Sequence, residues 1–285
     1  MKYKQLFIFS SCLSVLLLSL TIWSSFYNMT DNQFYLRDDQ ISISSYAQPL
    51  NAEIFDPNLG AVDSLIQLKS MIHQAIDDHD LSGIDVPIYI DDLVRKKFLH
   101  GLATISTNGN WAIKFIDKLF PNKEIISALH PNDIVKSNRA ICSQQAILFQ
   151  ELVKEFGFEY ESVGISIPLH EPLPDDINLT FNHYASAVKV ENDWYYFDSN
   201  LEPAYDRSNS EIYTKILAGE LSEFNKLYPG YKFKEIKYGM IYTSNRNTFP
   251  AKKGVLIQQI SKLVSFYGWL VLILLSFVFY RLSKK

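Results

Sequence analysis

Cysteine is scarce in this chain. The 285-residue sequence contains two cysteines, and only Cys142 lies outside the first long apolar segment. The central region therefore cannot form an internal disulfide bond. In an oxidising compartment such a lone thiol is a candidate reactive group.

An excess of positive charge is also absent. The formal net charge is -4, and this mildly acidic balance argues against nucleic acid as a partner. The sequence shows no internal repeat and no low-complexity tract.

Charged residues are missing altogether from two segments, residues 6–27 and 263–280. Each is close to the length of about 20 apolar residues that a helix needs to cross a bilayer. Aromatic residues of the kind found at membrane interfaces close the first segment at Trp23 and stand in the second at Trp269. We therefore expect an N-terminal transmembrane anchor in residues 1–27, and a C-terminal transmembrane helix with a basic tail in residues 251–285.

The first segment also has the basic start of a cleaved signal peptide. Its apolar run exceeds the usual signal core and no clean small-x-small site follows, which favours an uncleaved anchor. Basic residues flank both chain ends (Lys2, Lys4, Arg281, Lys284 and Lys285). They predict cytoplasmic tails and an extracytoplasmic or periplasmic central domain, although Lys252, Lys253 and Lys262 flank the second span on the other side.

Between the spans, residues 28–60 are polar and read as a stalk, and residues 61–250 are long enough for one domain. Apolar periodicity, caps and stops predict helices over residues 61–79, 91–106 with Asp91 or Asp92 as cap, 110–120 and 210–227. Strand-like runs cover "FEYESVGISI", "HYASAVKV" and "DWYYFDSN", and "YPGYKFKEIKYGMIYTS" reads as turn and strand, whereas residues 168–182 read as a loop. This order predicts an α+β fold with an antiparallel sheet.

The stretch "NRAICSQQAILFQELVKEFGF" predicts one more helix, with Gly157 as its stop. Its apolar stripe comprises Ala146, Phe149, Leu152, Val153 and Phe156, so Cys142 stands in or near the first turn. A cysteine there can be a small buried residue. It can also be a nucleophile, because the helix N-terminus favours the thiolate and its free amides can hold an oxyanion.

The predicted hairpin bears on that choice. If Glu191 and Asn192 form a two-residue turn, Ala185 lies opposite Asp198, and His183 becomes a diagonal neighbour of Asp198 on one face. Ala185 and Ala187 on the same face would let a helix approach closely. An aspartate that orients a histidine, which in turn activates a thiol, is the logic of a catalytic triad.

A cysteine at a helix start, a histidine opening a strand and the aspartate of "DWYYFDSN" together resemble the transglutaminase-like superfamily of papain-type thiol enzymes. The motifs cover residues 90–203. The resemblance implies a helical part packed on an antiparallel sheet, with Cys142 as nucleophile, His183 as base and Asp198 as orienting acid. Arylamine N-acetyltransferases have similar spacing, but two glycines precede their cysteine, where this chain has Ala140 and Ile141.

The implied function is that of a membrane-anchored hydrolase or acyltransferase working through a cysteine thioester. Water as acceptor gives a peptidase or deamidase, and an amine gives a cross-link on a protein or peptide substrate near the membrane. No cofactor or metal is expected. Because no upstream oxyanion residue is identifiable, the alternative is a catalytically inactive binding or assembly module of the same fold.

Other polar residues have a structural interpretation beside the functional one. Five residues near the predicted site either shape it or have only a structural place in a helix, the core or a loop: Gln144, Gln145, Trp194, Asn200 and Glu202. The group from His73 to Asp80 reads as a solvated helix end rather than a metal site, and His100, His130 and His170 as surface or cap residues. Asn28 and Asn178 match the glycosylation acceptor pattern.

Overall fold

The computed structural model describes residues 2–26, 55–120, 125–169, 180–201, 203–237 and 239–284. The polar stalk up to residue 54, the glycosylation candidates Asn28 and Asn178, His170 and Glu202 fall outside these ranges. The chain divides into two compact units, one of residues 1–40, 105–127 and 251–285 and the other of residues 41–104 and 128–250. The segment 105–127 thus groups with the terminal helices, whereas the sequence analysis expected it within a 61–250 domain.

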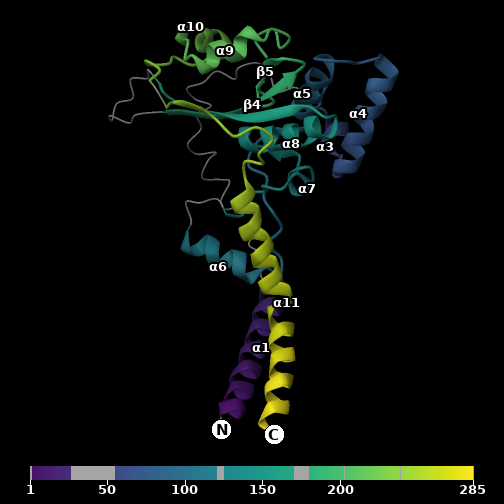
Figure 1. The fold of residues 1–285 in the computed structure, drawn as a ribbon, viewed down its shortest axis with the longest axis vertical. Helices are drawn as coiled ribbons and strands as arrows, with labels where there is room; N and C mark the ends of the chain where they lie inside the picture. Colours follow the sequence, from purple (N-terminus) through teal and green to yellow (C-terminus); the bar gives the residue numbers. More distant parts are fainter. Residues whose placement is uncertain are drawn as a thin grey trace. The chain divides into compact units, whose positions relative to one another are not determined.

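The first unit contains helices α1 (Lys2–Phe26), α6 (Trp111–Leu119) and α11 (Lys252–Ser283) (Figure 1). Both α1 and α11 are long and apolar enough to cross a membrane, which confirms the prediction of two candidate spans. They pack antiparallel along a seam of hydroxyls: Ser10 lies 2.7 Å from Ser276, and Thr21 donates to the Ser265 carbonyl at 2.6 Å. Small polar residues that bond across helices are typical of association within lipid.

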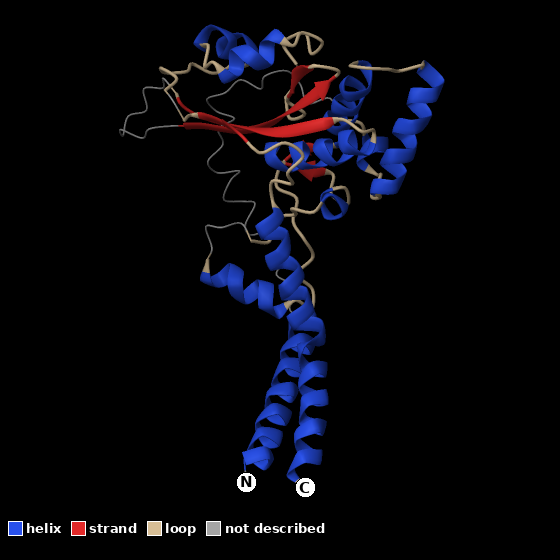
Figure 2. Cartoon of the chain, in the orientation of Figure 1, coloured by secondary structure: helices blue, strands red, loops and turns tan. Residues whose placement is uncertain are grey.

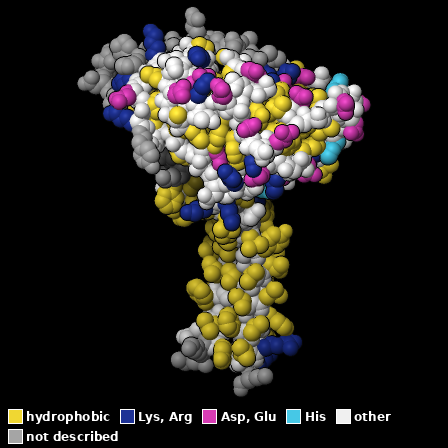
Figure 3. Space-filling view, turned by 45° about the horizontal axis from the view of Figure 1, so that its top comes forward, with side chains coloured by type: hydrophobic (Ala, Val, Ile, Leu, Met, Phe, Trp, Pro, Cys, Tyr) yellow, Lys and Arg dark blue, Asp and Glu magenta, His cyan; other side chains and the backbone are white. Residues whose placement is uncertain are grey.

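Hydrophobic side chains cover the outside of this helix pair (Figure 3). Exposed large apolar residues include Leu16 and Ile22 of α1 and Leu263 and Leu274 of α11. A water-soluble helix would bury such residues, so this surface is compatible with a membrane location.

The second unit holds α3 (Pro57–Gly60), α4 (Leu65–His79), α5 (Asp85–Lys97), α7 (Pro131–Ile134), α8 (Cys142–Glu155), α9 (Glu211–Leu217) and α10 (Leu221–Leu227). Its main sheet is antiparallel, in the order β5-β4-β3-β6. These strands are β3 (Glu159–Pro168), β4 (Thr180–Val190), β5 (Asp193–Phe197) and β6 (Ile241–Thr243). A short parallel pair joins β1 (Leu99–His100) to β2 (Arg139–Ala140). The mixed helix-and-sheet class predicted from the sequence is confirmed.

Helices cover both faces of the sheet (Figure 2). On one face Ala185 and Ala187 belong to a core cluster with Ile212 and Ile216 of α9 and Phe224 of α10. On the other face, the side chain of Gln150 in α8 donates to the hydroxyls of Ser162 and Ser186. Ser186 stands between Ala185 and Ala187 in β4, so it points to the opposite face from the two alanines. Ala185 and Ala187 therefore belong to the core on the side of α9 and α10, whereas α8 bonds to the opposite face of the sheet.

Two predicted helices have different boundaries in the structure. The helix expected at residues 91–106 is α5, which starts at Asp85 and ends at Lys97. Asp91 is thus not its cap but a fully buried residue of its interior. The helix expected at 210–227 is split into α9 and α10 by Gly219, whose φ of +72° suits glycine.

Candidate functional site

The hairpin of β4 and β5 has the predicted register, with Val190 opposite Asp193 and Ser186 opposite Phe197. The pairing stops there, so Asp198 lies one residue past the end of β5. At that point the chain leaves the sheet and the carboxylate turns to His183, whose Nε2 atom is 2.7 Å from Oδ2 of Asp198. Both side chains are buried, at 8% and 3% exposure.

Cys142 is the first residue of α8, as predicted. The first bonds of the helix run from the amides of Gln144 and Gln145 to the Ile141 carbonyl. The amides of Cys142 and Ser143 precede these bonds, so the thiol stands where the backbone favours negative charge. The side chain is partly exposed. It is therefore accessible in part, while the imidazole and carboxylate that the sequence analysis grouped with it are shielded from water.

The pKa of His183 rises from 6.5 to about 10. Burial alone would lower it, but the charge and the hydrogen bond of Asp198 outweigh burial, and the hydrogen bond and charge of Cys142 raise it further. The three predicted residues thus interact: aspartate with histidine directly, and cysteine with the same imidazole. Since Nε2 faces Asp198, Nδ1 is the ring nitrogen left for the thiol. Their catalytic role stays a prediction.

Two tyrosines support the carboxylate. The hydroxyl of Tyr228 donates to Oδ2 of Asp198 at 3.0 Å, and it lies 2.5 Å from the hydroxyl of Tyr196. The Tyr228 ring also packs against the His183 ring, with centroids 5.6 Å apart. The sequence analysis missed both tyrosines. The hairpin count would have placed Tyr196 on this face, but Tyr228 comes from the end of α10 and carries no such signal.

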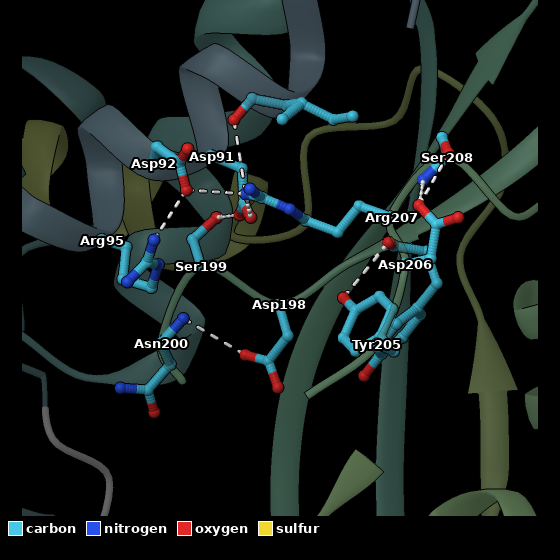
Figure 4. Close-up of polar contacts among 12 residues, drawn as sticks. Asp91, Asp92, Arg95, Asp198, Ser199, Asn200, Tyr205, Asp206, Arg207 and Ser208 are labelled. Carbon is cyan, nitrogen blue, oxygen red and sulfur yellow. Dashed lines mark hydrogen bonds and ion pairs between the residues drawn. The ribbon is translucent and has the colours of Figure 1, made fainter. Parts of the chain in front are cut away.

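A buried ionic cluster lies beside the aspartate (Figure 4). Arg207 lies 2.7 Å from Asp91 and 2.8 Å from Asp92, and Ser199, the residue after Asp198, donates to Asp91 at 2.6 Å. Desolvation raises the pKa of Asp91 although Arg207 and Ser199 oppose it. The cluster connects the segment after β5 to α5 and so restrains the backbone next to Asp198.

The two glutamines after Cys142 are buried. Gln144 accepts from the amides of Ala103 (2.8 Å) and Ile141 (3.2 Å) and donates to the carbonyls of Ala103 (2.7 Å) and Ala128 (2.9 Å). Its amide is thus committed to holding the start of α8, the structural one of its two interpretations. Gln145 donates to the Ala140 carbonyl at 3.2 Å.

The remaining candidate residues differ in whether they contact the site. Asn200 donates its amide to Asp198 (3.2 Å), and its side chain lies 3.3 Å from Nδ1 of His100, which the sequence analysis took as isolated. Trp194 packs on the core cluster, and His130 caps α7. Among the described residues no group of three or more His, Cys, Asp and Glu lies close enough to hold a metal ion. The stretch from His73 to Asp80 forms the last turns of α4 and its C-cap.

Neither a scan against protein-family models nor a search of curated proteins finds a match for this chain.

Proposed function

We propose that this chain is a membrane-anchored cysteine hydrolase or acyltransferase of the transglutaminase-like type, acting on amide bonds of a protein or peptide. The observation that carries the proposal is the contact of 2.7 Å between His183 and Asp198, made by an imidazole that also interacts with Cys142. An orienting carboxylate, an imidazole and a thiol at a helix start are the parts that such chemistry needs.

The reaction follows from these groups. The thiolate of Cys142 attacks the carbonyl carbon of the amide, and the oxyanion is held by first-turn amides of α8. The imidazolium of His183 protonates the leaving amine, the C–N bond breaks and a thioester remains. Water or an amine then attacks the thioester and gives a proton back to His183. The C–S bond breaks, the acid or the new amide leaves, and the thiolate of Cys142 is regenerated.

The raised pKa of His183, about 10, supports the first step. An imidazolium that persists at neutral pH is a proton donor for the leaving amine, and its charge favours the neighbouring thiolate. Asp198 keeps the ring oriented and the charge in place.

The test is alkylation of Cys142 by an iodoacetamide probe across pH in the full chain carrying Cys12→Ser, which removes the other free thiol, and in the same chain with His183→Ala. We expect fast labelling near neutral pH in the parent and labelling close to that of a free thiol, with a pKa near 8.5, in the variant. Equal rates in both proteins would contradict the proposal. In cells, a folded Cys142→Ser variant that keeps full function would instead support the inactive binding module.

A further inference from the structure

Helix α6 exposes an apolar stripe although it belongs to the unit of the two terminal helices. Trp111, Phe115 and Leu119 recur every four residues and so share one face. Phe115 and Leu119 are 60% and 56% exposed, and Phe120, which follows the helix, is 53% exposed. A helix in water normally buries such a face, so this one lacks its partner within the described residues.

The start of α6 is fixed to α11 by a polar cluster of Asn110, Ser261 and Ser265. Asn110 caps the helix and donates to Ser261 at 3.0 Å, and the hydroxyl of Ser265 donates back to Asn110 at 2.9 Å. The Ala112 amide donates to Ser265 at 3.0 Å. These bonds determine where along α11 the stripe begins.

That position is one end of the apolar helix pair. The charge-free segment of α11 starts just after Lys262. On the α1 side, Lys114 donates to the Ser24 carbonyl at 2.9 Å, and α1 ends at Phe26. Interfacial aromatics stand at the same end, with Trp23 59% and Tyr267 58% exposed.

Helix α6 then runs across the axis of the pair instead of along it (Figure 1). Its two lysines, Lys114 and Lys118, lie to one side of the apolar stripe. An apolar face with basic residues beside it, at the level of a bilayer surface, is the pattern of a helix that lies in the membrane interface.

We propose that α6 is an interfacial helix whose Phe115 and Leu119 insert into the lipid next to the two spans. The partner is thus the bilayer surface itself. The inference rests on the membrane anchoring within the proposed function, but not on any catalytic role of Cys142.

The test uses the full chain carrying Cys12→Ser and Cys142→Ala, reconstituted in phosphatidylcholine–phosphatidylglycerol vesicles. Single cysteines at Phe115, Leu119 and Lys118 receive a spin label, and collision rates with oxygen and with a water-soluble nickel chelate are measured. Ile66, 79% exposed on α4, is the aqueous control, and Leu274, 60% exposed on α11, is the lipid control.

We expect the oxygen-to-nickel ratio at 115 and 119 to be several-fold higher than at 118 and 66, and lower than that at 274, which lies near the middle of the span. An aqueous ratio at 115 and 119 with a lipid ratio at 274 would overturn the inference and leave the anchoring intact. Low collision rates with both reagents would also overturn it, because protein would then cover the stripe. An aqueous ratio at 274 would refute the anchoring itself.

Discussion

The Nε2 atom of His183 lies 2.7 Å from Oδ2 of Asp198, even though β5 ends one residue before the aspartate. The hairpin register brings the two residues near each other, and the departure of the chain from β5 completes the contact. The first prediction follows from this pair.

Replacing the carboxylate by an amide, Asp198→Asn, is expected to lower the pKa of His183 well below about 10. The charge that raises this pKa is lost, whereas the burial that lowers it remains. Titration of the histidine ring signals by NMR would measure the change. His130, which caps α7, serves as the internal control. An unchanged titration of His183 would contradict the assigned pair.

The same pKa predicts how stability depends on pH. Because the folded-state pKa of His183, about 10, exceeds its unfolded value of 6.5, its contribution is fully present below the unfolded value. It is lost as the pH rises through about 10. The parent should therefore exceed a His183→Gln variant in unfolding midpoint most clearly near pH 6, with the gap closing toward pH 11. A gap that widens with pH would reverse the sign and refute the prediction.

Gln144→Leu is expected to destabilise the chain by about 2 kcal/mol or more, because the Ala103 amide, the Ala128 carbonyl and the part-buried Ile141 amide lose the partner that Gln144 supplies. Urea unfolding of the detergent-solubilised chain would measure it. Gln74→Leu is the matched control, since Gln74 is exposed and its side chain donates to the side chain of Asp78, one helical turn further on, at 3.3 Å. Its effect should stay within about 0.5 kcal/mol, and equal losses would argue against the capping role.

Arg207→Met is expected to cost about 3–5 kcal/mol, because Asp91 would remain fully buried without its counterion. Adding Asp91→Asn should restore part of this loss. The control is Lys136→Met, which breaks the ion pair with Asp133 in which the lysine side chain is 63% exposed, and should cost at most about 1 kcal/mol. Similar costs for both methionine variants would contradict a buried role of Arg207.

The parts of this fold that the sequence predicted are those set by local chemistry. A two-residue turn at Glu191 and Asn192 determines the register of the hairpin, and a glycine stop with an apolar stripe defines α8. The two apolar helices follow from length and composition alone. Counting residues from the predicted turn was enough to predict that His183 and Asp198 lie near each other.

The missed features depend on contacts between distant segments. Asp91 looked like a helix cap because its partner, Arg207, stands in a loop far along the chain. Tyr228 reaches Asp198 only because α9 and α10 fold over the sheet. The grouping of residues 105–127 with the terminal helices likewise depends on bonds from Asn110 to α11.

The division of the chain has a consequence for proteolysis. The backbone passes between the two units four times, once between the described residues 26 and 55 and again near residues 104, 127 and 250. A single cut anywhere in the unit that carries Cys142 therefore leaves each fragment with one terminal helix, α1 or α11. Since these two helices pack on each other, one cleavage does not release the unit that carries Cys142 from the helix pair. Its release requires at least two cuts.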